Sequence, residues 1–388
     1  MSKLYERLSP IVSQLPPSGI RRFFDLASEM EDIISLGVGE PDFVTPWRVR
    51  EACIYALERG YTTYTSNRGL LELRTAIANY LERFSLRYDP LQELMVTVGG
   101  SEAIDIALRT LLCQGDEVLI PEPAYVSYYP CATLAGGVPI AVTTSAKDDF
   151  KLMPENLREM ITAKSKVLVL CYPNNPTGAI MRQEELSQIA EIVLEHDLFV
   201  ISDEIYAELT YGTQHASIAA LPGMKERTVL ISGMSKAFAM TGWRIGYAAA
   251  PLEILQEMLK VHQYTIMCAP IMGQMAAVEA LKNGEQDKER MIEEYDQRRR
   301  LIVQGLRSIG LSCHEPQGAF YAFPDITSTG LSSQDFAQGL LRHAKVAVVP
   351  GDAFGQSGQG YVRCSYATSV EQIERAIERM GKYVASLQ

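Results

Sequence analysis

Four polar residues follow short apolar runs, and their side chains could act together on one ligand. Ser101 follows LMVTVGG, Asn175 follows VLVLCYP, Asp203 lies in VISDEIY, and Lys236 lies in ISGMSKAF. In an open α/β sheet, the carboxyl ends of the parallel strands form the ligand crevice. We therefore predict that these four residues converge on one binding site.

Lys236 has the neighbours expected of a chemically active lysine. An isolated lysine is usually a solvated surface charge, but Met234, Ala237 and Phe238 flank this one. A lysine removed from water has a lowered pKa and can form a Schiff base. Arg244 follows eight residues later; it could be structural, but the arginine fork also suits a buried phosphate.

Two charged residues lie inside apolar strands and therefore need partners. Asp203 follows FVIS, and Arg363 lies within YVRCSYA. An unpaired buried charge is costly, so Asp203 either forms a buried salt bridge or holds the N–H of a pyridinium ring. Arg363 either pairs with an acidic side chain or binds a ligand carboxylate.

A glycine-containing turn joins a strand to a helix at residues 99–102 (GGSE). It can be a tight turn alone, or it can offer backbone N–H groups to an anion at the helix start. A dinucleotide fingerprint is absent, because GVGEPD at residues 37–42 lacks the third glycine and has Pro41 where a helix should begin.

The elements around these residues alternate between helical and strand patterns. Thr45 is predicted as the N-cap, and Pro46 as the first residue, of a helix through WRVREACIYALERG. Further helices are predicted at 69–84, 101–112 and 182–196, and strands at 94–100, 116–121, 166–173, 199–206 and 228–233. This alternation predicts an α/β fold with a mostly parallel central sheet and helices on both faces.

The pattern changes near Gly284. A long charged helix, several short strands and a last helix from Val370 to about Leu387 indicate a smaller α+β domain. We predict an N-terminal arm at 1–45 that packs with the small domain, a large domain at 46–283 and the small domain at 284–388.

Composition excludes several classes of protein. The chain has 388 residues, a net charge of −11 and 47% apolar residues, which indicates a globular protein of more than one domain. The acidic balance argues against a nucleic-acid-binding body. No apolar run approaches a membrane span, and the start lacks an apolar signal core, so a cytoplasmic location is expected. Seven scattered cysteines and five histidines show no metal-ligand spacing, so we expect no metal and no disulfide framework.

Three motifs together resemble one known family. YPNNPTG, SDEIY and SGMSKAFAMTGWRIGY occur in this order, as in the pyridoxal-phosphate-dependent aminotransferases of class I, fold type I. The resemblance extends from about Ser18 to the last helix. SGIRRF and YTTYTSNRGLLELR look most like the branch of N-acetyl-L,L-diaminopimelate and aromatic amino acid aminotransferases.

The resemblance implies a role for each candidate residue toward pyridoxal 5'-phosphate. Lys236 would bond covalently to the cofactor and move the proton, and Asp203 would pair with the pyridine nitrogen. The phenolic oxygen would be held by Tyr206 and Asn175, and Tyr125 would stack on the ring. The phosphate would be held by the backbone N–H groups of Ser101 and Glu102, together with Gly100, Ser235 and Arg244.

The resemblance also implies a substrate site and a partner. Arg363 would bind the substrate α-carboxylate, helped by Asn175 and the backbone at Gly39. Tyr64 would reach the phosphate of the neighbouring subunit, which makes a homodimer the active unit.

Three positions depart from the family pattern. Tyr125 stands where many relatives carry Trp, and Gly233 stands where many carry a phosphate-binding Ser, for which Ser235 is expected to compensate. Arg68 follows Tyr64 in a loop where small residues are common. Arg68 either forms a surface or inter-subunit salt bridge or reads a distal carboxylate across the dimer interface.

The predicted function is a transaminase that moves an amino group between an L-amino acid and a 2-oxo acid, typically 2-oxoglutarate, by a ping-pong mechanism. An aromatic or broad donor range is favoured over acidic or acyl-diaminopimelate donors. The alternative enzyme is a C–S β-lyase on the same fold. A pyridoxal-phosphate sensor fused to a DNA-binding domain is disfavoured, because no helix-turn-helix segment precedes the aminotransferase part. A purely structural protein leaves Lys236, Asp203 and Arg363 unexplained.

Overall fold

The computed structural model describes residues 4, 7–17 and 30–387. The stretch SGIRRF, at residues 18–23, lies outside the described residues. The part of the resemblance to the aminotransferase branch that it carries is therefore not described by the structure. The centre of the larger part of the molecule is a seven-stranded sheet in the order β2-β8-β7-β6-β5-β3-β4. Its strands are β2 (Leu94–Thr97), β3 (Glu117–Glu122), β4 (Val138–Thr143), β5 (Ser165–Cys171), β6 (Phe199–Asp203), β7 (Thr228–Gly233) and β8 (Gly246–Ala249).

The sheet is mostly parallel, as predicted. Only β8 runs against its neighbours, pairing antiparallel with both β2 and β7, and the sequence analysis did not anticipate this strand. β2 consequently runs in the same direction as β5, β6 and β7. The carboxyl ends of these four strands therefore lie along one edge of the sheet.

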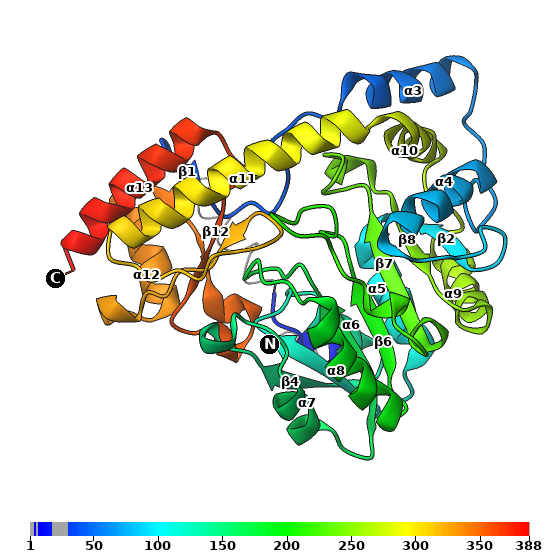
Figure 1. Ribbon diagram of the computed structural model, residues 1–388, viewed down its shortest axis with the longest axis horizontal. Helices are drawn as coiled ribbons and strands as arrows, with labels where there is room; N and C mark the ends of the chain where they lie inside the picture. The colour runs from blue at the N-terminus through cyan, green and yellow to red at the C-terminus, as the bar shows by residue number, and fades with distance from the viewer. Residues whose placement is uncertain (1–3, 5–6, 18–29, 388) are drawn as a thin grey trace.

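Helices cover both faces of the sheet (Figure 1), and the side chains of β5 show why. Val167 and Val169 pack in one apolar cluster with α5 and α9, whereas Leu168 and Leu170 pack in another with α8. A strand buried on both faces is expected to be apolar throughout. The helices of this region are α3 (Trp47–Glu58), α4 (Leu71–Leu81), α5 (Gly99–Leu111), α6 (Tyr128–Leu134), α7 (Pro154–Met160), α8 (Gln183–Glu195), α9 (Leu252–Thr265) and α10 (Ile271–Asn283).

The predicted cap of the first of these helices is wrong by one residue. α3 begins at Trp47, Pro46 is its N-cap, and no side chain caps the helix. The Thr45 hydroxyl donates instead to the carbonyl of Ala239 and accepts from Trp243 Nε1. The Thr45 hydroxyl therefore forms tertiary hydrogen bonds beside the Lys236 turn and does not cap the helix.

A second group of elements lies at the other side of the molecule. α11 (Glu285–Ser308) and α13 (Val370–Ala385) run beside each other at the left of Figure 1. They share an apolar cluster with the segment at residues 30–36 and with small sheets. The remaining elements are β1 (Ile34–Ser35), β9 (Tyr321–Ala322), β10 (Val346–Ala347), β11 (Val349–Pro350), β12 (Val362–Ser365), α12 (Ser333–Gly339) and, near the N-terminus, α1 (Pro10–Gln14).

The N-terminal segment joins the C-terminal elements through backbone pairing. β1 pairs parallel with β10, and the N–H of Leu36 donates to the carbonyl of Ala347 at 2.8 Å. Ile34 and Leu36 are buried in the same cluster as α11 and α13. The exact domain boundaries at residues 45 and 283 remain predictions.

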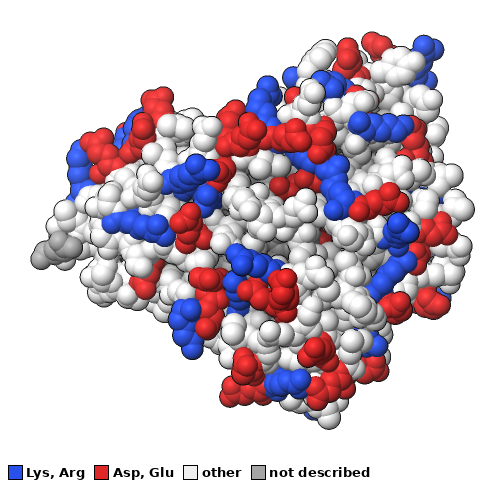
Figure 2. Space-filling view, in the orientation of Figure 1, with Lys and Arg blue, Asp and Glu red and all other residues white. Residues whose placement is uncertain are grey.

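The surface carries charges of both signs. On the face in Figure 2, lysine and arginine are interspersed with aspartate and glutamate, and no continuous basic surface is seen there. Within the described parts of the chain, no helix combines the length and the apolar character that a membrane crossing requires.

Candidate active site

One cavity of about 690 Å³ lies at the carboxyl edge of the sheet. Ser101, Asn175, Asp203 and Lys236, which follow or end four strands, all line it, so the four landmarks of the sequence do converge. The other predicted residues in its lining are Gly39, Gly100, Tyr125, Tyr206, Ser235, Arg244 and Arg363.

Two predicted residues do not line the cavity. The Glu102 carboxylate turns away to accept the N–H of Val98 and to bond His262 Nδ1 at 2.6 Å, so only its backbone remains a candidate ligand. Tyr64 is 79% exposed on the surface of the chain. Its predicted role across a subunit interface stays a prediction.

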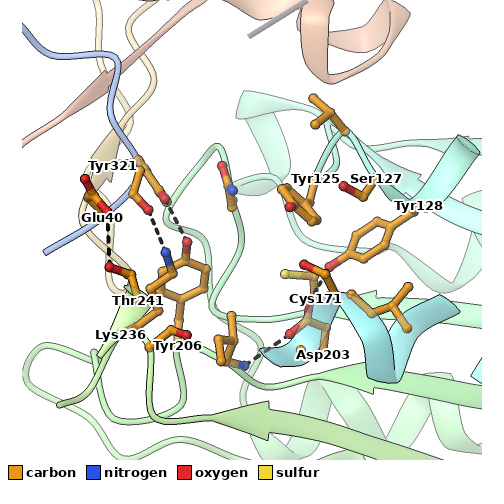
Figure 3. Close-up of a pocket in the computed structure, with 18 of the residues that line it drawn as sticks. Glu40, Tyr125, Ser127, Tyr128, Cys171, Asp203, Tyr206, Lys236, Thr241 and Tyr321 are labelled. Carbon is orange, nitrogen blue, oxygen red and sulfur yellow. Dashed lines mark hydrogen bonds between the residues drawn. The ribbon is translucent and has the colours of Figure 1, made fainter. Parts of the chain in front are cut away.

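Lys236 extends into the cavity from the turn after β7. Its Nζ donates to the carbonyl of Gly39 at 2.6 Å (Figure 3). Burial first, and then the positive charges of Arg363 and Arg244, lower the pKa of the Lys236 amine to about 8, against the opposing effects of Glu40 and Asp203. A sizeable fraction of the amine is therefore uncharged and nucleophilic near neutral pH.

Asp203 ends β6 on the opposite side of the cavity. One carboxylate oxygen accepts the hydroxyl of Tyr128 at 2.7 Å, and the other accepts the N–H of Ile205 at 3.2 Å. Burial raises the pKa of Asp203 to about 6, and these hydrogen bonds act against that rise. No salt bridge to Asp203 forms among the described residues, so its carboxylate remains able to pair with a ligand cation.

Arg363 is almost fully buried and keeps unused hydrogen-bonding capacity. Its two terminal nitrogens donate to Asn175 Oδ1 at 2.8 Å and to the carbonyl of Gly37 at 2.6 Å. Its Nε has no partner among the described residues. Tyr321 lies under the guanidinium at 4.4 Å. A buried guanidinium with neutral partners and a free donor is suited to a ligand carboxylate.

Tyr206 and Tyr321 form the wall beside Lys236. Their hydroxyls lie 2.7 Å apart, and the amine of Lys236 lies 5.8 Å from the Tyr206 ring centroid. Figure 3 shows Tyr125 on the far side, near Asp203 and Tyr128. A flat ring placed between these walls meets aromatic side chains and hydrogen-bonding groups.

The start of α5 and Arg244 make one end of the cavity suitable for an anion. Gly99 has a φ of +75°, and a Cβ there would lie 2.4 Å from Arg244 Nη2. Glycine is therefore required at this position for two reasons: the left-handed backbone conformation and the close approach of the Arg244 guanidinium. Free N–H groups at the helix start, the buried Ser235 and Arg244 form a donor set typical of phosphate sites. The residues present thus fit a phosphorylated pyridine aldehyde.

The structure explains one of the three departures from the family pattern, at Gly233, and shows the surroundings of a second, Arg68. A Cβ at Gly233 would lie 2.8 Å from the carbonyl of Ile245, across the β7–β8 pair, so a larger residue has no room. Arg68 Nη1 donates to the carbonyl of Gln92 in its own chain at 2.8 Å. Arg68 has no acidic partner among the described residues.

Several lining residues were missed by the sequence analysis. They are Glu40, Ile104, Val126, Ser127, Tyr128, Cys171, Ile205, Thr241 and Tyr321. Glu40 and Thr241 bond each other at 3.1 Å at the cavity. The place of Cys171 was partly recoverable, because it lies near the carboxyl end of a predicted strand; the structure ends β5 at Cys171 and pairs it with Asp203. Tyr321 comes from β9, and no local signal connects that strand to this site.

Comparison with known proteins agrees with this geometry. The family model for aminotransferase class I and II matches residues 31–380. A putative aminotransferase, YugH, of Bacillus subtilis is 58% identical over 97% of this chain and 98% of its own length. An aspartate aminotransferase of Pyrococcus abyssi is 48% identical over 94% and 95%. A solved aromatic aminotransferase of Pyrococcus horikoshii has a TM-score of 0.90 and 46% identity, covering 95% and 99%.

Fold and site together define an enzyme that uses pyridoxal 5'-phosphate to transfer amino groups. The chain belongs to the family of class I and II aminotransferases. Its reaction class is transamination, and the expected fold type I is confirmed. The names of the relatives differ in the amino acid that they use, so they leave the donor of this chain open.

Proposed function

We propose that this enzyme transfers the amino group of an aromatic or broad range of L-amino acids to a 2-oxo acid, with 2-oxoglutarate as the expected acceptor, by a ping-pong mechanism. The observation that carries the proposal is the arrangement of one cavity. Lys236 faces Asp203 across it, and it is lined by one cation suited to a phosphate, Arg244, and one suited to a carboxylate, Arg363.

The ring is held by residues on several strands. When bound, pyridoxal 5'-phosphate supplies an electron sink that stabilises negative charge at the substrate α-carbon. Asp203 pairs with the ring nitrogen, and Tyr206 and Asn175 hold the phenolic oxygen. Tyr125 covers the ring face. The phosphate binds at the end of the cavity formed by the start of α5 and Arg244. Its ligands there are Gly100, Ser101, the Glu102 backbone, Ser235 and Arg244.

Lys236 moves the proton. Its uncharged amine is the base that takes the proton from the substrate α-carbon, and the resulting ammonium is the acid that gives it back. The lowered pKa of about 8 places the amine near the pH at which both forms are available. The carbonyl of Gly39, now bonded to Lys236 Nζ, offers the released amine a neutral acceptor.

Arg363 orients the substrate. Its guanidinium takes the α-carboxylate common to every amino acid, with Asn175 and the Gly39 backbone beside it. The partners that it now has, Asn175 Oδ1 and the Gly37 carbonyl, are neutral. A carboxylate can displace them with a gain in charge-assisted hydrogen bonding.

The lining favours donors with uncharged side chains. Among the described residues, Lys236, Arg244 and Arg363 are the cavity's cationic side chains, and each has a role toward the cofactor or the α-carboxylate. None of these three is left for a second carboxylate, so within the described part of one chain the cavity offers no cation to an acidic side chain; Arg68 acting across the interface is the alternative. Tyr125, Tyr128 and Tyr321 and the carboxylate of Glu40 also line the cavity. This supports aromatic and other apolar donors over aspartate or glutamate.

The active unit is proposed to be a homodimer in which Tyr64 reaches the neighbouring subunit's phosphate, and the expected location is the cytoplasm. The dimer proposal is supported by the exposure of Tyr64 next to other exposed apolar residues, including Tyr264 and Met267. Asn67 joins their two loops by donating to the carbonyl of Met267 at 2.7 Å.

A spectroscopic titration tests this function. Single L-amino acids are added, without an oxo acid, to the cofactor-loaded protein while its visible absorbance is followed and the released oxo acid is identified. We expect aromatic donors to convert the cofactor to its amine form stoichiometrically, and Lys236→Ala to show no conversion. Pyruvate and ammonia formed with unchanged cofactor absorbance would instead identify a lyase.

A further inference from the structure

The partner of Asp203 within the protein is a tyrosine that no sequence motif indicated. The Tyr128 hydroxyl donates to Asp203 Oδ2 at 2.7 Å (Figure 3). Tyr128 is only 1% exposed. The Ile205 N–H reaches the other carboxylate oxygen at the longer distance of 3.2 Å. The phenol therefore provides the shorter of the two hydrogen bonds that orient this carboxylate.

Tyr128 is fixed by the turn that also carries Tyr125. Its N–H donates to the carbonyl of Tyr125 at 3.2 Å, and it begins α6. The two rings meet edge to face, with centroids 5.6 Å apart and an interplanar angle of 81°. One short segment thus supplies both the ring proposed to cover the cofactor and the hydroxyl that holds Asp203.

We propose that Tyr128 is a positioning residue that keeps Asp203 ionised and aimed at the ring nitrogen of the cofactor. This inference rests on the proposed pairing of Asp203 with that nitrogen. Tyr128 acts through Asp203 and needs no contact with the reacting atoms.

The physical reason is the cost of an ionised carboxylate in this buried place. Burial raises the pKa of Asp203, and the Tyr128 hydrogen bond is the largest influence that lowers it. A donor to the charged form stabilises that form. Burial also raises the pKa of Tyr128 well above its usual value, so the hydroxyl remains a donor throughout the working pH range.

The other titratable groups around Asp203 do not replace this donor. Cys171 from β5 and the adjacent Glu204 have acidic side chains, and Lys236 acts on Asp203 only at longer range. Lys236 is also the group that must be free to move the substrate proton. Among the described side chains near Asp203, Tyr128 is thus the one that stabilises its charge by a hydrogen bond without taking part in proton transfer, alongside the backbone N–H of Ile205.

The test compares Tyr128→Phe with Tyr129→Phe. The second variant makes the same change at the next residue, whose buried hydroxyl lies near Glu122. Each protein is loaded with pyridoxal 5'-phosphate carrying ¹⁵N in the ring. The protonation of the ring nitrogen is followed by NMR against pH, and the rate of cofactor release is measured separately.

We expect the ring nitrogen of the wild type and of Tyr129→Phe to remain protonated well above neutral pH. In Tyr128→Phe it should lose its proton at lower pH, and the cofactor should leave about tenfold faster, as expected for a lost hydrogen bond to a charged group. Equal titrations in both variants overturn the inference. If Tyr128→Phe does not fold, a wild-type ring nitrogen that deprotonates near neutral pH overturns it equally.

The Asp203→Asn background separates this inference from the proposed function. If Tyr128 acts through Asp203, adding Tyr128→Phe to Asp203→Asn changes neither the titration nor the release rate further. If Asp203→Asn itself leaves ring protonation unchanged, the proposed role of Asp203 fails. If Asp203→Asn abolishes protonation and Tyr128→Phe does not weaken it, only the role of Tyr128 fails.

Discussion

Arg363 is the residue whose buried environment makes the sharpest prediction about substrate binding. If Arg363 takes the carboxylate shared by all donors, as proposed, Arg363→Ala should raise KM by about 10- to 100-fold for every amino acid tested, the loss typical of a charge-assisted pair. Steady-state kinetics with a panel of donors measure this. Arg363→Lys retains the charge without the fork and should recover only part of the loss. An effect confined to one donor contradicts the assignment.

Asp203 should destabilise the protein that lacks cofactor. Its pKa is raised from 3.8 to about 6 on folding, so the folded state binds its proton more tightly than the unfolded chain does. The tighter proton binding stabilises the folded state at low pH, and this stabilisation is lost as pH rises through about 6. The stability of cofactor-free Asp203→Asn relative to wild type should therefore rise by about 1 kcal/mol between pH 5 and pH 8.

Urea unfolding of both cofactor-free proteins at the two pH values measures this difference. The sign of this change with pH is informative, because Asp203→Asn, which should lose activity, should gain stability relative to wild type as pH rises. A difference that does not change with pH would show that the Asp203 carboxyl titrates alike in the folded and unfolded states.

Single residues also show where sequence reasoning succeeds. Lys236, Asp203 and Arg363 attracted attention because a charge inside an apolar stretch has to be explained. Tyr128 did not, because a tyrosine at such a position is usually a core residue, and its value lies in one hydrogen bond to a residue 75 positions away. A role that depends on a hydrogen bond to a residue far away in the sequence cannot be predicted from the local sequence pattern.

At the scale of elements, the parallel strands were predictable and their partners were not. Each strand end that carries a landmark residue follows a short apolar run, so the converging edge of the sheet could be predicted. β8 was missed because GYAA has small residues and little strand character. Small residues are needed there, since a Cβ at Gly246 would lie 2.5 Å from the Gly99 backbone.

A buried ion network joins α11 to α4 and to the loop after β6. Lys288 of α11 is 2% exposed, and its amine lies 2.7 Å from Glu208 and 2.9 Å from Glu285. Glu208 also accepts from Arg83 at 3.0 Å and from the Tyr80 hydroxyl. Removing one partner of a buried pair leaves an uncompensated charge, which costs about 3–5 kcal/mol.

Lys288→Met should accordingly destabilise the protein by about 2–4 kcal/mol. This is less than the usual cost of breaking a buried pair, because Arg83 and Tyr80 still form hydrogen bonds with Glu208. The double variant Lys288→Met with Glu208→Gln removes both charges and should recover part of the loss. Urea unfolding measures all three proteins. Additive losses in the double variant would show that the two side chains do not act as a pair.

At the scale of the whole molecule, the chain presents apolar side chains that a single copy leaves uncovered. Tyr64, Tyr264 and Trp47 are 79%, 87% and 57% exposed. The Asn67 hydrogen bond to the Met267 carbonyl brings the segments of Tyr64 and Tyr264 together, and exposed apolar residues that lie together typically mark an interaction surface. Neither composition nor periodicity could reveal this surface, because each residue taken alone reads as an ordinary part of a helix or loop.

The proposed sharing of Tyr64 between subunits makes a distinctive prediction for mixed dimers. Tyr64→Phe should weaken cofactor binding by about tenfold in every site of its homodimer, the loss expected for one hydrogen bond to a phosphate. Lys236→Ala should abolish turnover in its homodimer. In a mixed dimer, the site with an intact Lys236 receives the intact Tyr64 of the Lys236→Ala subunit.

That site should bind cofactor as tightly as the wild type and should restore close to half of the wild-type activity per dimer. Purification of mixed dimers through two different affinity tags, followed by cofactor titration and turnover measurement, tests this. A mixture of Lys236→Ala with wild type serves as the control for simple dilution. If Tyr64 served its own subunit, the only site with a lysine would keep the weakened cofactor binding of Tyr64→Phe, and the recovery would not appear.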